Sequence, residues 1–285
     1  MEKGKIAIIG SGYVGAAIAY ALTYIENVRQ VVLVDICKNA SEGEALDISH
    51  GIGELSTVEV IAGDYDECRD CEVIVITAGK NRRPEQKRME LLEGNKEIYK
   101  DVLDKLQNVY QESFVIVVSN PVDALTSYVA MRGFVPPHKL CGTGCMLDSS
   151  RWVREISNYL KIENSRVTAY AVGEHGSGQR VKWEYVSVDG MPIGDYCQKY
   201  GVVWNEQVRL EMHSRVTNMG ADIIRRKGKT QYGIATVVAY LVKHLMESEK
   251  VMVSVSTVLG ESDVVESKLV YIGKDEIEYR ASYCD

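Results

Sequence analysis

No stretch of this 285-residue chain is apolar for the length that a membrane-spanning helix needs, so we expect no membrane association. A secretory signal is missing as well. Met1 to Lys5 lead directly into an apolar segment without an n-region, an h-region and a cleavage site, which predicts a cytoplasmic protein. The net charge of -7 and the lack of a basic stripe with interleaved aromatic residues argue against nucleic acid as a partner.

Cysteine patterns typical of disulfide frameworks or zinc sites are also missing. The 7 cysteines are an odd number and lie scattered along the chain. Cys68 and Cys71 form a CxxC, but neither a second CxxC nor a histidine pair accompanies it, as a zinc site would require. We therefore expect free thiols in a reducing compartment and no metal site. Redox or metal binding at the CxxC is the less favoured alternative.

What is present is an alternation of short apolar runs with helical patterns. The runs are rich in β-branched residues, as buried parallel strands are, and cover residues 5–9, 31–34, 58–62, 73–76 and 114–118. This order predicts an α/β fold with a doubly wound parallel (Rossmann) sheet, whose ligands lie at the carboxyl ends of strands. The later part is typical of α+β structure, with helices at 203–226 and 235–246 and extended segments at 251–258 and 264–272. We expect a Rossmann domain over 1–141 and an α+β substrate and catalytic domain over 142–285.

The first apolar run leads directly into Gly10-Ser-Gly-Tyr-Val-Gly15, a GxGxxG between a strand and a helix. The first glycine makes the turn, the second lets the backbone approach a pyrophosphate, and the third lets the helix pack on the strand. The next strand ends at Asp35, whose carboxylate suits the ribose hydroxyls of NAD and would repel the 2′-phosphate of NADP. The sequence therefore predicts an NAD site, with a glycine-rich turn without a ligand as the alternative.

Two further strand ends carry small or polar residues. Thr77-Ala78-Gly79 follows one strand and would let the cofactor lie against the backbone, and Asn120 follows another. The polar segment 80–88 contains Arg82 and Arg88. It is either a solvated loop or a mobile lid that carries arginines over a bound anion. The predicted cofactor-binding residues are Gly10, Gly12, Tyr13, Val14, Gly15, Asp35, Thr77, Ala78, Gly79 and Asn120.

The second half contains a histidine in the glycine-bracketed turn Gly173-Glu-His-Gly176, at the end of an apolar strand over 167–171. Because imidazole titrates near neutrality, a positioned histidine is a natural proton shuttle. Asp148 and Arg151 are spaced to share one face of a helix. Taken alone, each feature has a structural alternative, namely a histidine in an ordinary turn and a local ion pair.

Together these motifs resemble the L-lactate/malate dehydrogenase family. The resembling segments, in family order, are Gly10–Gly15, Asp35, Gly43–Asp47, Thr77–Gly79, Arg88, Ser119–Pro121, Gly142–Arg151, Gly173–Gly176 and Lys229–Ala235. The resemblance implies an NAD-dependent L-2-hydroxy acid dehydrogenase that transfers hydride reversibly between NADH and a small 2-oxo acid. It also implies a glycolytic role in the cytoplasm and a homodimer or homotetramer.

The resemblance also implies a role for each site residue. His175 would donate the proton to the substrate carbonyl, Asp148 would hold His175, and Arg88 would polarise the carbonyl from the closing lid. Arg151 would bind the substrate carboxylate in a two-pronged grip. The implied catalytic residues are His175, Asp148 and Arg88, and the implied substrate-binding residues are Arg151, Arg82, Asn120 and Thr230.

The signals about the substrate conflict. Arg82 stands where malate dehydrogenases of this family usually carry arginine, and a buried cation there would need a second substrate carboxylate. The segment Gly142-Thr-Gly-Cys145 and Thr230 look like the lactate branch. We therefore expect L-lactate and pyruvate, with L-malate and oxaloacetate as the close alternative and a bulkier acid of the L-2-hydroxyisocaproate type as the third.

Other classes stay open. A non-catalytic NAD-binding relative is one, although the complete set of catalytic residues favours an enzyme. A reductase of sugars or alcohols is another, and it would not need Arg151. Val153 and Thr168 replace the basic residue and histidine of sugar-bisphosphate-activated relatives, so we expect no such activation. The chain stops at Asp285, where the family continues through a terminal helix, so we expect that helix to be missing.

Overall fold

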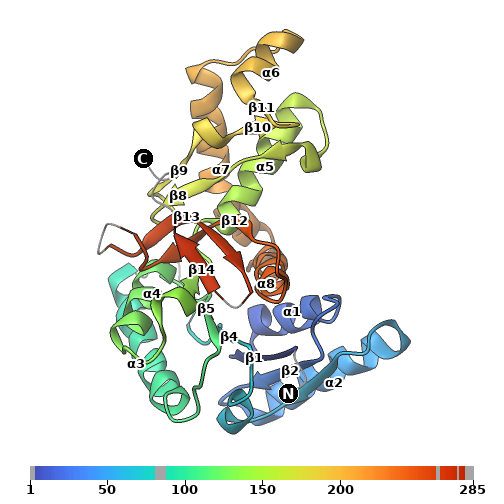
Figure 1. Ribbon diagram of the computed structural model, residues 1–285, viewed down its shortest axis with the longest axis vertical. Helices are drawn as coiled ribbons and strands as arrows, with labels where there is room; N and C mark the ends of the chain where they lie inside the picture. The colour runs from blue at the N-terminus through green and yellow to red at the C-terminus, as the bar shows by residue number, and fades with distance from the viewer. Residues whose placement is uncertain (1–3, 81–87, 261–263, 275, 280–285) are drawn as a thin grey trace.

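The computed structural model describes residues 4–80, 88–260, 264–274 and 276–279, and the side chain of Arg88 lies outside this description. Its main feature is a large sheet of mixed direction that runs through the whole molecule (Figure 1). In spatial order its strands are β3 (Glu59–Ala62), β2 (Gln30–Val34), β1 (Lys5–Ile9), β4 (Val73–Ile76), β5 (Phe114–Val117), β6 (Leu140–Gly142), β12 (Val251–Thr257), β13 (Glu266–Gly273), β8 (Ala171–Gly173) and β9 (Gln179–Val181). A further strand, β14 (Glu276–Tyr279), pairs with β13.

The first six strands of this sheet are parallel, in the order 3-2-1-4-5-6. The predicted doubly wound α/β fold is therefore confirmed. Successive side chains of a strand point to opposite faces of the sheet. Ile6 and Ile8 accordingly enter one core cluster and Ala7 and Ile9 the other, and all four are buried. Burial on both faces explains why these strands are continuous apolar runs in the sequence.

Helices cover both faces of the parallel part. Three of them, α1 (Tyr13–Leu22), α2 (Lys38–Ile52) and α8 (Tyr232–Leu245), contribute to the first cluster. Two others, α3 (Arg88–Leu106) and α4 (Val122–Met131), contribute to the second. Helix α8 comes late in the chain yet packs against α1 of the first half, so one core joins the two halves.

A second lobe stands at the upper end of the molecule in Figure 1. It contains α5 (Met146–Leu160), α6 (Ile193–Tyr200), α7 (Glu206–Lys227) and a small sheet of β11 (Met191–Pro192), β10 (Ser187–Val188) and β7 (Val167–Thr168). Its core is separate from the other two and is built around the buried indole of Trp152. Strands β12 and β13 lie between this lobe and the parallel sheet.

The structure differs from the sequence prediction at several boundaries. The apolar segment expected as one strand over 167–171 is divided between β7 in the small sheet and β8 in the large one. The predicted helices at 203–226 and 235–246 are found as α7 and α8 with shifted ends, and β14 was not predicted. Within the described residues, no helix is both long and apolar enough to cross a membrane.

Candidate functional site

The glycine loop between β1 and α1 is held in place by close backbone contacts. Gly10 has a φ of +103°, and a Cβ there would lie 2.6 Å from the nitrogen of Ala78. A Cβ on Gly15 would collide with the carbonyl oxygen of Gly10. A Cβ on Gly12, by contrast, would meet no protein atom within 4 Å. Gly10 and Gly15 are thus required by the fold, whereas Gly12 keeps open a space that a ligand can use.

The carboxylate of Asp35 stands directly beside this loop. It accepts hydrogen bonds from the backbone nitrogens of Ser11, at 2.7 Å, and Cys37, at 2.9 Å. The hydroxyl oxygen of Ser11 is buried and has no hydrogen-bond partner among the described residues. Next to Asp35, the side chain of Ile36 is 98% exposed. An unpartnered hydroxyl, an open space over Gly12 and a bare apolar side chain fit the phosphate, ribose and adenine parts of a dinucleotide.

The carboxyl ends of β4 and β5 complete the wall of this site. The Thr77 hydroxyl donates to the carbonyl oxygen of Gly10 at 2.6 Å, and the Ser119 hydroxyl donates to that of Ala78 at 2.7 Å. A Cβ on Gly79 would lie 3.2 Å from the Cβ of Ser119, so the two strand ends are in contact. These bonds connect the predicted segment 77–79 with the glycine loop and with the segment that carries Asn120.

Asn95 was not predicted, yet it ties the strand ends together. Its side chain is fully buried on α3 and accepts a hydrogen bond from the nitrogen of Lys80 at 2.7 Å. It also donates to the carbonyl oxygen of Asn120 at 2.7 Å. A single buried amide therefore connects the segments that follow β4 and β5 at the carboxyl ends of these strands. The signal in the sequence was a polar residue within the apolar stripe of a helix.

Two ionic contacts in the interior of the molecule lie around Asp148 on α5. The carboxylate accepts from Nδ1 of His175 at 2.8 Å through one oxygen and from Nη1 of Arg151 at 2.7 Å through the other. The side chain of Asp148 is 1% exposed, and those of His175 and Arg151 are 27% and 17% exposed. Three predicted residues thus meet in one buried cluster that opens to solvent on the side of His175.

The fold explains this meeting. Asp148 and Arg151 lie three positions apart, one turn of α5, and the turn after β8 carries His175 to the same place. Helix α7 comes close at a glycine, because a Cβ on Gly220 would lie only 3.4 Å from Nη2 of Arg151. Burial tends to raise the pKa of Asp148, but its bonds to His175 and Arg151 outweigh burial and lower the pKa. Asp148 is therefore an anion that fixes both partners.

A second buried carboxylate, Asp123 on α4, holds the backbone at the histidine. It accepts from the backbone nitrogen of His175 at 2.8 Å and from the hydroxyl of Ser256 on β12. Burial raises the pKa of Asp123, in contrast to that of Asp148. The sequence did not single out Asp123 or Ser256. For Asp123 the available signal, which we did not use, is its position three residues after Asn120 at a strand end.

The same cluster tests the prediction about metals. Cys145, Asp148 and His175 place one ligand atom each within 4.8 Å of one another. A cysteine binds a metal ion as a thiolate, however, and burial raises the pKa of Cys145, which favours the neutral thiol. Both carboxylate oxygens of Asp148 already bind nitrogen atoms. This donor set does not suit a metal ion.

The structure describes some of the remaining predicted residues fully and others in part or not at all. Tyr13 is 61% exposed at the start of α1, with the Lys229 ammonium over its ring, and Val14 packs on the core beside it. Thr230 lies half-buried between α7 and α8. Arg88 begins α3, but its side chain and the whole of Arg82 lie outside the described residues.

Comparison with known proteins agrees with this geometry. A family model described as the NAD binding domain of lactate/malate dehydrogenase matches residues 4–142, and one described as the alpha/beta C-terminal domain matches residues 145–282. The chain belongs to the lactate/malate dehydrogenase family. As a member it is an NAD-dependent oxidoreductase that acts on a small molecule.

Relatives within the lactate/malate dehydrogenase family are similar over nearly the whole chain. An L-lactate dehydrogenase of Thermoanaerobacter sp. (strain X514) is 35% identical over 277 residues, which are 96% of this chain and 89% of the relative. One of Clostridium botulinum (strain Loch Maree / Type A3) is 36% identical over 280 residues, 96% of this chain and 87% of the relative. The crystal structure of the minor L-lactate dehydrogenase from Enterococcus mundtii, in the ligands-bound form, superposes with a TM-score of 0.92 at 31% identity. It covers 98% of this chain and 90% of that one.

Proposed function

We propose that this chain is an NAD-dependent L-lactate dehydrogenase that interconverts pyruvate and L-lactate. The observation that carries the proposal is the double contact of Asp148, which binds a proton carrier through one oxygen and a carboxylate-binding arginine through the other. A 2-oxo acid presents a carbonyl next to a carboxylate. An enzyme for it therefore requires a proton donor and a carboxylate-binding group side by side. The names of the relatives support lactate within this class.

In the proposed reaction, the residues around Asp148 have different chemical roles. Nδ1 of His175 faces Asp148, which leaves Nε2 to give a proton to the carbonyl oxygen on reduction and to take it back on oxidation. The Asp148 anion stabilises the imidazolium that this cycle needs. Arg151 uses one N–H on Asp148, and its other N–H groups can bind the substrate carboxylate in the planar two-bond geometry of a guanidinium. When bound, NADH supplies the hydride.

Four further residues complete the proposed site. Arg88 would stabilise the developing negative charge on the carbonyl oxygen, and Arg82 would face the variable end of the substrate. Asn120, at the end of β5, would orient the substrate and hold the nicotinamide, and Thr230 would line the substrate pocket. Together with the glycine loop, Asp35 and segment 77–79, these residues would form the NAD and substrate site of the proposed enzyme.

The substrate is tested by NADH oxidation with pyruvate, oxaloacetate and 2-oxoisocaproate in parallel, comparing kcat/KM. We expect pyruvate to be preferred. A preference for oxaloacetate would instead show that Arg82 reaches the site and binds a second carboxylate. A preference for 2-oxoisocaproate would indicate a wider pocket. If NADH binds but no 2-oxo acid reacts, the chain is a non-catalytic NAD-binding relative and the proposal fails.

We further propose a cytoplasmic homodimer or homotetramer whose functional units divide near residue 142. The two family models support the division, because one ends at residue 142 and the other begins at residue 145. Light scattering on the purified protein at several concentrations measures the assembly. A particle of one chain's mass, 31.8 kDa, would contradict the proposed oligomer.

A further inference from the structure

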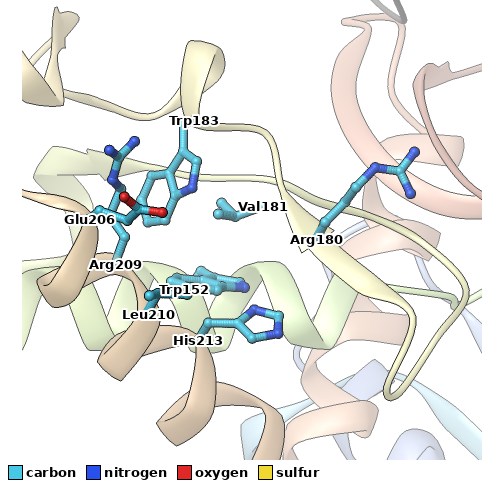
Figure 2. Close-up of a pocket in the computed structure, with 8 residues that line it drawn as sticks. All are labelled: Trp152, Arg180, Val181, Trp183, Glu206, Arg209, Leu210 and His213. Atoms are coloured by element: carbon cyan, nitrogen blue, oxygen red, sulfur yellow. The ribbon is translucent and has the colours of Figure 1, made fainter.

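A cavity of about 380 Å³ lies in the upper lobe, and its α5 residue, Trp152, is one turn further along the helix than Asp148. It is enclosed by α5, β9 with the segment that follows it, and the first two turns of α7 (Figure 2). Its lining residues are Trp152, Arg180, Val181, Trp183, Glu206, Arg209, Leu210 and His213. A volume of this size admits a small organic molecule. Nothing in the proposed lactate dehydrogenase reaction uses it.

The walls of this cavity are mainly aromatic. The rings of Trp152 and Trp183 meet edge to face with centroids 5.3 Å apart, and the His213 ring lies 6.0 Å from that of Trp152. Figure 2 shows Val181 over the indole of Trp152 and His213 beside its nitrogen-bearing edge. A flat, apolar group can therefore be covered on two sides by indole and aliphatic surface.

Two buried N–H donors in the lining have no hydrogen-bond partner among the described residues. They are Nε1 of Trp152, whose side chain is fully buried, and Nε of Arg209. A buried donor without an acceptor costs free energy, so such donors normally mark a bound water or a ligand oxygen. Both donors belong to side chains that line the cavity.

The charge of the lining favours an anion. The Arg209 guanidinium lies 5.8 Å from the centroid of the Trp183 ring, whereas Figure 2 shows the guanidinium of Arg180 directed away from the two indoles, on the side where it approaches Gly173. The nearby carboxylates of Glu155 and Glu211 pair with Arg215, and in the part of the chain that the structure describes Arg209 forms no ion pair. Glu206 is the single acidic residue in the lining. Arg209 is thus the positive group beside the aromatic wall, and without an ion pair to Glu206 it can attract an anion.

We propose that this cavity is a binding site for a small aromatic carboxylate. The ring would lie against Trp152, Trp183 and Val181, and the carboxylate oxygens would accept from the unpartnered donors. Binding of the carboxylate would also affect the proposed reaction site indirectly. Trp152 directly follows Arg151 on α5, and Arg180 packs on the strand that leads to His175. Binding itself does not depend on which 2-oxo acid the enzyme reduces.

The chain supplies its own reporter for this site. It contains 3 tryptophans, and all of them belong to one cluster, because Trp204 packs on Trp183 with ring centroids 5.4 Å apart. Titration of the purified protein with benzoate, without NADH or substrate, should therefore change tryptophan fluorescence saturably. Benzamide has the same shape without the charge. We expect it to bind about tenfold more weakly, as the loss of a charge-assisted hydrogen bond predicts.

Variants of Arg209 and Glu206 on α7 test the predicted effect of each charge on the affinity for benzoate. Arg209→Met should weaken benzoate binding about tenfold, and Glu206→Gln should strengthen it about twofold to threefold because a like charge is removed. Trp152→Phe keeps the aromatic wall but removes the N–H, and should weaken binding about fivefold. Arg225→Met is the matched control, since Arg225 lies at the other end of α7 and pairs with Asp222. It should leave benzoate binding unchanged.

Several results would overturn the proposal. Equal affinities for benzoate and benzamide would mean that the lining charge plays no part. An affinity unchanged by Arg209→Met but lost in Arg151→Lys would place benzoate at the substrate site instead. No fluorescence change up to about ten millimolar benzoate would mean that the cavity is not a carboxylate site. These results leave the dehydrogenase proposal untouched, because none of them measures turnover.

Discussion

The proposed sites in the nucleotide-binding half and the catalytic half of this molecule consist of different chemical groups, mainly backbone groups in the first and side chains in the second. In the first, the proposed NAD site consists mostly of the backbone of one short loop, Gly10 to Gly15, and of the carboxylate of Asp35, which accepts a hydrogen bond from that loop. In the second, side chains from distant parts of the chain meet. Asp148 and His175 are separated by 27 positions, Asp123 and His175 by 52, and Ser256 and Asp123 by 133.

This difference has a physical basis. A phosphate can be bound by backbone N–H groups at a helix start, and only a turn and small residues are needed to expose them. Proton transfer needs an ionisable side chain at a defined distance from a charge, and the local chain cannot provide that alone. The two halves should therefore respond differently to mutation, and four predictions follow from this comparison in order of decreasing effect.

The largest effect is expected in the catalytic half from His175→Asn. Asparagine keeps a polar side chain but cannot carry a proton at neutral pH, so turnover should fall by about 10²–10⁴-fold. The affinity for NADH, measured by titration of the nucleotide's fluorescence, should stay unchanged because the glycine loop is untouched. Turnover above about a tenth of the wild-type value would contradict the assignment of His175 as the proton donor.

The next effect concerns the two buried carboxylates and appears in thermal or urea unfolding at several pH values. Asp148→Asn should destabilise the protein by about 2 kcal/mol near neutral pH, because the bonds to His175 and Arg151 lose their charge. The pKa of Asp148 is lowered in the folded state. Its contribution is therefore present above the ordinary carboxyl pKa and is lost as pH falls, so the deficit should shrink in acid.

Asp123→Asn is the matched control for that pH series. The pKa of Asp123 is raised by burial, so its favourable contribution is present below the ordinary carboxyl pKa and is lost as pH rises through the raised value. The deficit of this variant should therefore shrink toward neutral pH, in the direction opposite to that of Asp148→Asn. Deficits that change in the same direction would refute the contrast between the two carboxylates.

In the nucleotide-binding half, two glycines of one loop should behave differently. Gly15→Ala introduces a methyl group that collides with the Gly10 carbonyl, and should lower the free energy of unfolding by about 1–3 kcal/mol. Gly12→Ala meets no protein atom, so stability should be kept while NADH affinity falls about tenfold. Equal NADH affinity in wild type and Gly12→Ala would show that the ligand does not approach the backbone at this glycine.

The smallest effect is expected on β12. Ser256→Ala removes one hydrogen bond from Asp123 and should cost about 1 kcal/mol of stability together with a few-fold loss of turnover. Ser254→Ala is the control, because the Ser254 hydroxyl binds the Ala171 carbonyl rather than Asp123. It should cost similar stability and leave turnover unchanged. If both variants lose turnover equally, the hydrogen bond between Ser256 and Asp123 is not needed to position His175.

Much of the fold and part of the site could be predicted because the signals are local. Strands buried on both faces must be continuous apolar runs, and β1 and β4 were found at the predicted residues. The helical spacing of Asp148 and Arg151 predicted their shared face, and they form an ion pair on α5. The NAD-binding fold and the cofactor were read from the glycine loop and Asp35, and the family comparison agrees.

For other features, the sequence near the residue does not identify the contact that the residue makes. Asn95, Asp123 and Ser256 are polar residues in apolar surroundings, and nothing near them in the sequence names their partners. Position 82, on which the preference for pyruvate or oxaloacetate depends, lies outside the described residues, so the choice between these substrates stays a prediction for the kinetic assay.

The amino-acid order was thus sufficient for the period of the strands, the turn at Gly10 and the shared helix face of Asp148 and Arg151, because steric and chemical properties of single residues and their spacing decide these. Only the folded chain decided that α8 packs on the first half, that a segment expected as one strand is divided between two sheets, and that two carboxylates with oppositely shifted pKa values meet at His175. Those features depend on burial and on contacts between distant segments, and both arise only when the chain is packed.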